Sequence, residues 1–266
     1  MFRSIQIQTI DLCNRSCYFC PNSQDIRKTD SLMSEKTFSR ILEQLKELDY
    51  TGAIKPYLQN EPLLDQRLPE FIHEIRKIFP ENVICINTNG DLLDQQDIRN
   101  ALVNSGIDGI QVNSYGGNTL WTERNELLDR WAGSNNLLYL HQSGSFRDMK
   151  KRNEKVNLWH QWVPQALSNF WNRGGSLTNF KPHWESWKYE FCNLIFNNMY
   201  INHLGQAILC CGDWKYKVIL GQINEISLDK IWQSPRYQHY RERHLAKEID
   251  DLPLCKSCNR VRHLAD

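Results

Sequence analysis

Hydrophobic residues follow two different spacings along the first half of the chain. From Ile5 to Ile10 apolar and polar positions alternate for most of the run, which indicates a strand. From Ser34 onward apolar residues recur three or four positions apart, which predicts a helix over 34–49 with Ser34 as its N-cap. The same spacings predict strands at 53–59, 83–87, 109–113 and 136–141 and helices at 68–79 and 94–104. Strands that alternate with helices in this way indicate βαβ units and a parallel sheet, so the predicted class is α/β.

The pattern is less regular between residues 118 and 190. We expect this stretch to hold the last elements of the sheet and a link to a C-terminal module. It contains Trp121, Trp131, Trp159, Trp162, Trp171, Trp184 and Trp187. Because aromatic side chains mostly supply core area, we expect them to pack in the core or in a lid, and a substrate groove is the alternative for some.

Charge and composition restrict the possible partners. The chain has 266 residues, enough for one large α/β domain with a small appendage, and its formal net charge is +1. Its basic residues are dispersed, whereas nucleic-acid-binding proteins gather them in a patch. The apolar runs are shorter than the roughly 18 residues that span a bilayer, and the first residues lack the apolar segment of a signal peptide. We therefore expect a cytoplasmic protein with neither a nucleic-acid nor a membrane partner. Nine cysteines in a reducing compartment indicate that the clustered ones are metal ligands, whereas Cys85, in the middle of a predicted strand, is expected in the core.

Three of these cysteines, Cys13, Cys17 and Cys20, have the spacing C-x3-C-x2-C directly after the first predicted strand. Iron–sulfur clusters are usually held by four cysteines. Three thiolates therefore leave one iron of a four-iron cluster open to another ligand. Zinc is an alternative, but a structural zinc site takes four ligands. Disulfides are a second alternative, and they require an oxidising compartment.

This motif, with the aromatic Phe19 directly before its last cysteine, resembles the radical S-adenosylmethionine (radical SAM) superfamily. The resemblance implies a [4Fe–4S] cluster whose open iron binds S-adenosylmethionine, and an external electron donor. Reductive cleavage of S-adenosylmethionine then gives a 5′-deoxyadenosyl radical that takes hydrogen from a substrate. The resemblance also implies the fold, a partial (β/α)6 barrel similar to a TIM barrel, which we place at residues 1–185.

In parallel α/β sheets, ligands bind beyond the carboxyl ends of the strands. The first such stretch, Gln59-Asn60-Glu61-Pro62, resembles the Gly-Gly-Glu-Pro motif of the superfamily, although both glycines are replaced. Asn60 tolerates unusual backbone angles better than most residues. The resemblance implies that Glu61 binds the ammonium of S-adenosylmethionine, a charge-assisted hydrogen bond. The alternative is that this stretch only forms a turn.

Two more stretches end predicted strands. Asn89 follows the strand at 83–87, and Asn113 and Ser114 follow the strand at 109–113. These side chains both donate and accept hydrogen bonds, as contacts to methionine or ribose hydroxyls require, but a plain turn explains them equally well. Arg147, after the fifth strand, is a candidate for pairing with the methionine carboxylate and is otherwise a solvated side chain.

A second cysteine set lies in the last 75 residues, namely Cys192, Cys210, Cys255 and Cys258. Four thiolates suit either zinc or a fully ligated four-iron cluster. The order, a cysteine followed by G-x4-C and C-x2-C, resembles the SPASM domain in its short "twitch" form. The resemblance implies one auxiliary [4Fe–4S] cluster in a module at residues 186–266.

Cys211, next to Cys210, remains open: it is a spare thiol, an alternative ligand or a hydrogen-atom donor to a substrate radical.

The substrate is not fixed by these motifs. The resemblance favours a ribosomally made peptide that is epimerised, cross-linked or spliced, and in that case a separate leader-binding protein presents it. The alternative is dehydrogenation of a secondary alcohol on an aminocyclitol or sugar, with the auxiliary cluster accepting an electron. A third interpretation, a non-catalytic iron–sulfur scaffold, is disfavoured by the intact cysteine triad and Glu61.

Overall fold

The computed structural model describes residues 1–24, 30–115, 118–141, 156–162, 173–177 and 192–258. Its strands are β1 (Ser4–Ile7), β2 (Ala53–Lys55), β3 (Cys85–Thr88), β4 (Gly109–Ser114), β5 (Leu138–His141), β6 (Asn157–Trp162), β7 (Asn198–Ile201), β8 (Gln206–Ile208) and β9 (Ile219–Gln222). Its α-helices are α1 (Glu35–Glu47), α2 (Leu68–Ile78), α3 (Gln96–Asn104), α4 (Asn118–Asn135), α5 (Leu194–Asn197), α6 (Leu228–Trp232) and α7 (Pro235–Leu245). Four short 3-10 helices lie between these elements or after the last of them: η1 (Pro21–Gln24), η2 (Pro62–Leu64), η3 (Asp91–Asp94) and η6 (Cys255–Ser257).

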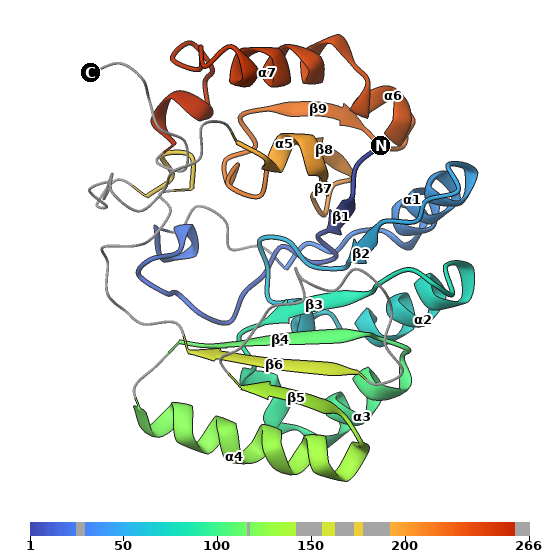
Figure 1. The fold of residues 1–266 in the computed structure, drawn as a ribbon, viewed down its shortest axis with the longest axis vertical. Coiled ribbons are helices and arrows are strands. Elements are labelled where there is room, and N and C mark those ends of the chain that lie inside the picture. Colours follow the sequence, from blue (N-terminus) through green and yellow to red (C-terminus); the bar gives the residue numbers. More distant parts are fainter. Residues whose placement is uncertain (25–29, 116–117, 142–155, 163–172, 178–191, 259–266) are drawn as a thin grey trace.

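The strands form two sheets that meet along one edge (Figure 1). One has the order β2-β1-β7-β8-β9, and the other, β3-β4-β6-β5, is parallel throughout. A parallel bridge between Ile54 and Ile84 joins β2 to β3. The expected α/β partial barrel is therefore confirmed, with β1 to β6 parallel and β6 inserted between β4 and β5.

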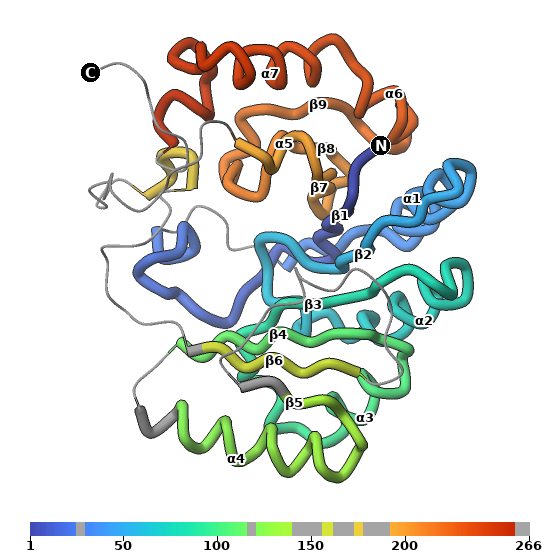
Figure 2. Tube along the Cα trace, in the orientation of Figure 1, coloured from blue at the N-terminus to red at the C-terminus, as the bar shows by residue number. Residues whose placement is uncertain are grey.

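The C-terminal part of the chain continues the barrel sheet. Strand β7 pairs with β1 in parallel from Ser4 opposite Asn198 to Ile7 opposite Ile201, and β8 and β9 follow in antiparallel fashion. Figure 2 shows the blue N-terminal strand beside the orange C-terminal strands. The predicted boundary between residues 185 and 186 lies outside the described residues and stays a prediction.

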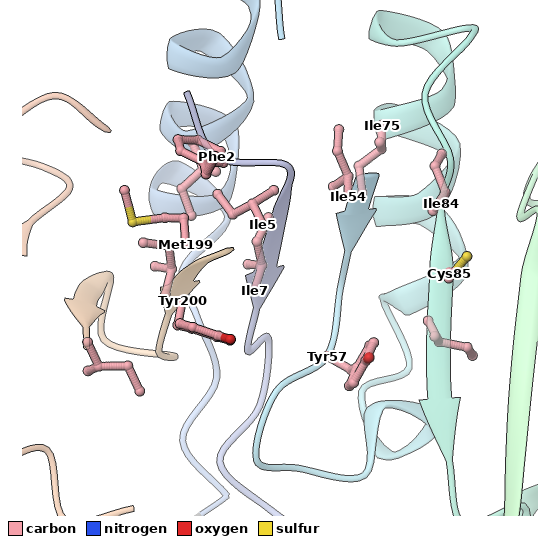
Figure 3. Close-up of a cluster of buried hydrophobic side chains, with 14 of the residues drawn as sticks. Phe2, Ile5, Ile7, Ile54, Tyr57, Ile75, Ile84, Cys85, Met199 and Tyr200 are labelled. Atoms are coloured by element: carbon pink, nitrogen blue, oxygen red, sulfur yellow. The ribbon is translucent and has the colours of Figure 1, made fainter. Parts of the chain in front are cut away.

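Side chains of neighbouring strands form a common core. Figure 3 shows six of these side chains, all fully buried, from β1, β2 and β7 and from the residue before β3: Ile5, Ile7, Ile54, Ile84, Met199 and Tyr200. Burying one such side chain stabilises the fold by about 1.5–3 kcal/mol. The strands that carry the two cysteine sets are thus held by one continuous core.

Local sequence explains where several elements begin. Ser34 caps α1 by accepting a hydrogen bond from the backbone N of Thr37 at 3.1 Å, as predicted. The first strand ends at Ile7, earlier than predicted, because Thr9 and Asp11 hydrogen-bond to residues 31–33 instead of to β2. The sequence pattern did not predict helix α4 or strand β6. Within the described part of the chain, no helix is long and apolar enough to cross a membrane.

Two tryptophans of the irregular stretch pack in the core, as expected. Trp131 and Trp159 are buried in the core, and Trp121 stacks on His160 with ring centroids 4.0 Å apart. Trp171, Trp184 and Trp187 lie outside the described residues.

Candidate active site

The three cysteines of the first set lie on the loop between β1 and α1, at the carboxyl end of β1. The loop turns between Cys17 and Cys20, where the backbone N of Cys20 donates to the carbonyl of Cys17 at 2.8 Å. Burial, followed by the neighbouring charges of Glu61, Cys20 and Cys17, raises the pKa of Cys13 to about 11. Burial and then Cys20 raise the pKa of Cys17 as well. The thiols are therefore close together, and burial favours their protonated form. Binding to a metal centre would favour the thiolate form instead.

A salt bridge fixes this loop to the end of β3. Arg15, inside the cysteine motif, donates from Nε and Nη2 to the two carboxylate oxygens of Asp91 at 2.6 and 2.5 Å, and from Nη1 to the carbonyl of Tyr115 at 2.5 Å. Asn14 adds a hydrogen bond to Asp91 at 3.1 Å and accepts one from Asn89 at 2.7 Å. A bidentate Arg–carboxylate pair has a defined geometry, so the cysteine loop has one position relative to the strand ends. Neither Arg15 nor Asp91 was predicted for the site, although an arginine between Cys13 and Cys17 is visible in the sequence.

Glu61 lies between the ends of β2 and β3 and is only 2% exposed. Its Oε1 accepts hydrogen bonds from Thr88 Oγ1 at 2.6 Å and from the backbone N of Leu63 at 3.1 Å, and its Oε2 accepts one from the backbone N of Asn89 at 2.7 Å. Burial raises the pKa of Glu61 to about 7, although these three donors oppose the shift. A carboxylate has about four acceptor sites, so Oε2 keeps one for a further donor.

One cavity collects the candidate residues at the carboxyl ends of the strands, and we call it the strand-end cavity. The cysteine loop contributes Cys13, Arg15, Cys17, Phe19, Cys20 and Asn22 to its lining. The strand ends contribute Tyr57, Leu58, Gln59, Asn60, Glu61, Asn87, Thr88, Asn89, Asn113 and Tyr115, and later parts of the chain add Arg173 and Trp214. Six of these residues carry neutral amides, which can both donate and accept.

The predicted contacts Asn60, Asn89 and Asn113 all line this cavity. Asn60 Oδ1 accepts a hydrogen bond from the backbone N of Leu58 at 2.9 Å, and Asn113 Nδ2 donates to Asn87 Oδ1 at 2.5 Å. Sequence reasoning thus placed them correctly at the cavity, while their contacts to a cosubstrate stay predictions.

Ser114 and Arg147 differ from the other candidates. Successive residues of a strand point to opposite faces, and Ser114 lies opposite Asn113, with its Oγ 2.7 Å from Nε2 of His160. His160 in turn contacts Asn125 of α4. The structure therefore places Ser114 on the helix-covered side of β4, away from the cavity. Arg147 lies outside the described residues.

The second cysteine set comes together from three separate segments. Cys192 precedes α5, Cys210 follows β8, Cys255 begins η6 and Cys258 follows it; all four are buried. Burial, followed by the nearby thiols of Cys211, Cys192, Cys255 and Cys258, raises the pKa of Cys210 well above its ordinary value. The set therefore forms one buried group of thiols. These thiols would lose their protons on binding a metal centre.

Iron–sulfur cubanes fit both cysteine sets better than single ions do. Within the described residues, no three Cys, His, Asp or Glu side chains are grouped tightly enough to enclose one metal ion. A cubane holds its ligand sulfurs farther apart, because each sulfur binds a different corner. The residues present, three thiols at an open cavity and four buried thiols, match an open cluster and a fully ligated one.

Contacts between the two halves of the chain place the second set near the cavity. Gln59 Nε2 donates to the carbonyl of Cys211 at 2.9 Å. Gly174 and Gly175, both at positive φ, form a turn against the Cys255–Cys258 loop, and Ser257 Oγ donates to the carbonyl of Gly174 at 3.1 Å. Arg173, directly before this turn, lines the strand-end cavity. One short segment therefore contacts both the cavity and the Cys255–Cys258 loop. The side chain of Cys211 is half-buried and does not line the cavity, and its role as a hydrogen donor stays a prediction.

Comparison with known proteins finds two families along the chain. Residues 7–135 match the radical SAM superfamily, and residues 192–259 match the SPASM iron–sulfur cluster-binding domain. The S-adenosyl-L-methionine-dependent 2-deoxy-scyllo-inosamine dehydrogenase of Niallia circulans is 28% identical over 261 residues, which cover 98% of this chain and 94% of that protein.

Solved structures give the same picture. The structure of BtrN in complex with AdoMet and 2-DOIA superposes with a TM-score of 0.77 at 25% identity, covering 97% of this chain and 93% of that one. The structure of anSMEcpe with bound AdoMet has a TM-score of 0.60 at 11% identity, covering 95% and 84% of the two chains, which shows a shared fold only.

Proposed function

The chain belongs to the radical SAM superfamily and carries a SPASM region, and from this premise we propose that it dehydrogenates a secondary alcohol on an aminocyclitol or sugar. As a radical SAM enzyme it uses a [4Fe–4S] cluster, S-adenosylmethionine and an auxiliary [4Fe–4S] cluster. The first cysteine set would hold the former cluster and the second set the latter. Such enzymes also need an external electron donor.

The observation that carries this proposal is the match to a dehydrogenase along 98% of the chain, through both cysteine-bearing regions. The sequence alone favoured a peptide substrate. Peptide-bound structures of related fold, such as SuiB with its precursor peptide SuiA at 13% identity, share only the fold with this chain. The comparison therefore supports the alcohol more strongly than the peptide and the leader-binding partner.

The arrangement of the cavity suits oxidation of an alcohol. Converting a carbinol to a ketone removes one hydrogen atom, one electron and one proton from the substrate, and the proton passes to water. When bound, S-adenosylmethionine on the first cluster supplies the acceptor of the hydrogen atom, and the auxiliary cluster supplies an acceptor of the electron. The Gln59–Cys211 hydrogen bond and the Gly174–Gly175 turn hold the second cysteine set beside the cavity where the electron is released.

We assign the cavity residues by their chemistry. Glu61 accepts a hydrogen bond from the methionine ammonium at the remaining site on Oε2, and the amides of Asn60, Asn89 and Asn113 orient the cosubstrate's polar groups. On the side that faces the second cysteine set, Arg173 and Trp214 line the cavity and are placed to hold the substrate. Neutral amides pair well with hydroxyl groups, because both kinds of group donate and accept.

The test uses reconstituted, reduced enzyme under anaerobic conditions. It is incubated with S-adenosylmethionine and aminocyclitols, starting with 2-deoxy-scyllo-inosamine, that carry deuterium on their carbinol carbons. We expect deuterium in 5′-deoxyadenosine and one ketone per molecule of 5′-deoxyadenosine. Arg173→Gln should raise KM for the alcohol while leaving S-adenosylmethionine binding unchanged. Deuterium transfer from a labelled peptide, with none from any cyclitol or sugar, would refute the proposal.

A further inference from the structure

A buried histidine touches a ligand of the second cysteine set. His244 lies in the last turn of α7, is 1% exposed, and has its Nε2 at 3.3 Å from Sγ of Cys255. His244 does not line the strand-end cavity, and none of the roles assigned above involves its imidazole. Among the described residues, its Nδ1 has no hydrogen-bond partner, so Cys255 is the contact that the ring makes through its nitrogens.

Neighbouring contacts hold the two residues in this position. Arg243, next in the helix, donates to Glu248 at 2.5 Å and to Asp251 at 2.8 Å, which fixes the connection from α7 to the Cys255 loop. Tyr240, one turn earlier, is buried on the same face of α7 as His244. His244 is itself only 1% exposed, so its imidazole has little room to turn away from the sulfur.

The chemistry of the pair gives the contact a direction. A sulfur bound to iron has lost its proton and can only accept a hydrogen bond. An imidazole ring carries a hydrogen on at least one of its two nitrogens, and Nε2 is the nitrogen that faces the sulfur. Only the tautomer with that hydrogen on Nε2 gives a favourable contact with the sulfur.

We propose that His244 donates an Nε2–H···S hydrogen bond to Cys255 and thereby raises the reduction potential of the auxiliary cluster. Hydrogen bonds to the ligand sulfurs are one of the factors that set such potentials. The bond strengthens when the cluster gains an electron and its sulfurs become more negative, so it favours the reduced state. His244 is thus a positioning residue that makes the auxiliary cluster a better electron acceptor, whichever substrate supplies the electron.

The potential is measured in the full-length chain with Cys13, Cys17 and Cys20 changed to Ala, so that the auxiliary cluster alone is titrated by electron paramagnetic resonance. In His244→Phe we expect the ratio of reduced to oxidised cluster at a fixed potential to fall about tenfold, which is 59 mV for one electron. His244→Gln keeps an N–H donor and should recover part of this shift. His239→Phe, at an exposed position of the same helix, is the matched control and should leave the potential unchanged.

A second measurement needs no variant. In the otherwise unchanged enzyme labelled with 15N-histidine, the reduced auxiliary cluster should show one weak nitrogen coupling, as a hydrogen-bonded imidazole gives. A strong coupling would mean that His244 binds iron directly, and would overturn the proposal. An unchanged potential in His244→Phe with a full iron content would also overturn it. Neither result depends on whether the substrate is an alcohol.

Discussion

Replacing Glu61 by glutamine tests the cosubstrate site most directly. The substitution keeps the size of the side chain and removes its charge. Both oxygens of Glu61 now accept hydrogen bonds, from Thr88 and Leu63 on one side and from Asn89 on the other. The glutamine amide has only one oxygen, so its NH2 group would face either the Asn89 N–H or the two donors on the other side.

The structure sets the size of the expected effect. A hydrogen bond to a charged group contributes about 1.5–3 kcal/mol, so losing the carboxylate–ammonium contact should weaken S-adenosylmethionine binding by about 10- to 150-fold. Leaving one buried N–H without an acceptor costs the fold about 1–3 kcal/mol. Burial makes the charged form of Glu61 unfavourable and raises its pKa to about 7. Glutamine carries no charge to bury, and this gain in stability offsets part of the cost.

The pH dependence gives a second, independent readout. A raised carboxyl pKa means that the protonated form gains population as the pH falls through about 7, and this form cannot pair with an ammonium. The methionine amino group keeps its proton in this range, since an α-amino group has a pKa of about 7.7–8.0. The affinity of the unchanged enzyme should therefore fall several-fold, approaching about tenfold per pH unit, as the pH drops below 7, and that of Glu61→Gln should stay flat.

Anaerobic calorimetry on the reconstituted enzyme measures both effects. Glu35→Gln makes the same chemical change at an exposed position in the first turn of α1 and is the control. We expect its affinity and its pH profile to match those of the unchanged enzyme. Unchanged affinity in Glu61→Gln, together with a flat profile in the unchanged enzyme, would refute the role assigned to Glu61.

Three further predictions concern the cysteine sets and the turn that joins them. Cys17→Ala should abolish formation of 5′-deoxyadenosine, because two thiolates do not hold the open cluster; product seen by chromatography would contradict the assignment. Cys255→Ala should lower the iron content by about four per chain while leaving some uncoupled cleavage, and zinc found in its place by elemental analysis would rule out an auxiliary cluster. Gly175→Ala should lower the free energy of unfolding by about 1–3 kcal/mol, because its φ is +79° and a Cβ would lie 2.6 Å from Oγ of Ser257. Gly133→Ala, in helix α4 with nothing within 4 Å of its Cβ position, should leave stability unchanged or raise it by up to about 1 kcal/mol, and equal losses in the two variants would show that the turn is not constrained.

Sequence periodicity predicted the regular part of the fold closely. Helices expected at 34–49 and 68–79 are α1 and α2, and the strand expected at 109–113 is β4, within one or two residues at each end. After residue 118 it predicted the strand at 136–141, which is β5, but neither α4, which carries a weak apolar stripe, nor β6, which contains polar and aromatic residues together. The place of β6 between β4 and β5 is a long-range choice that local spacing does not encode.

The spacing of residues along the sequence was enough to identify the first cysteine set and to place Glu61 at a strand end, since both depend on residues close together in the chain. The tertiary structure decided everything that requires distant segments to meet. It joined Arg15 to Asp91, gathered Cys192, Cys210 and Cys255 from three segments, turned Ser114 away from the cavity, and set His244 against the sulfur of Cys255. The physical reason is that hydrophobic burial brings β7 beside β1 across almost two hundred residues. The polar contacts of the site follow from that packing and leave no periodic trace in the sequence.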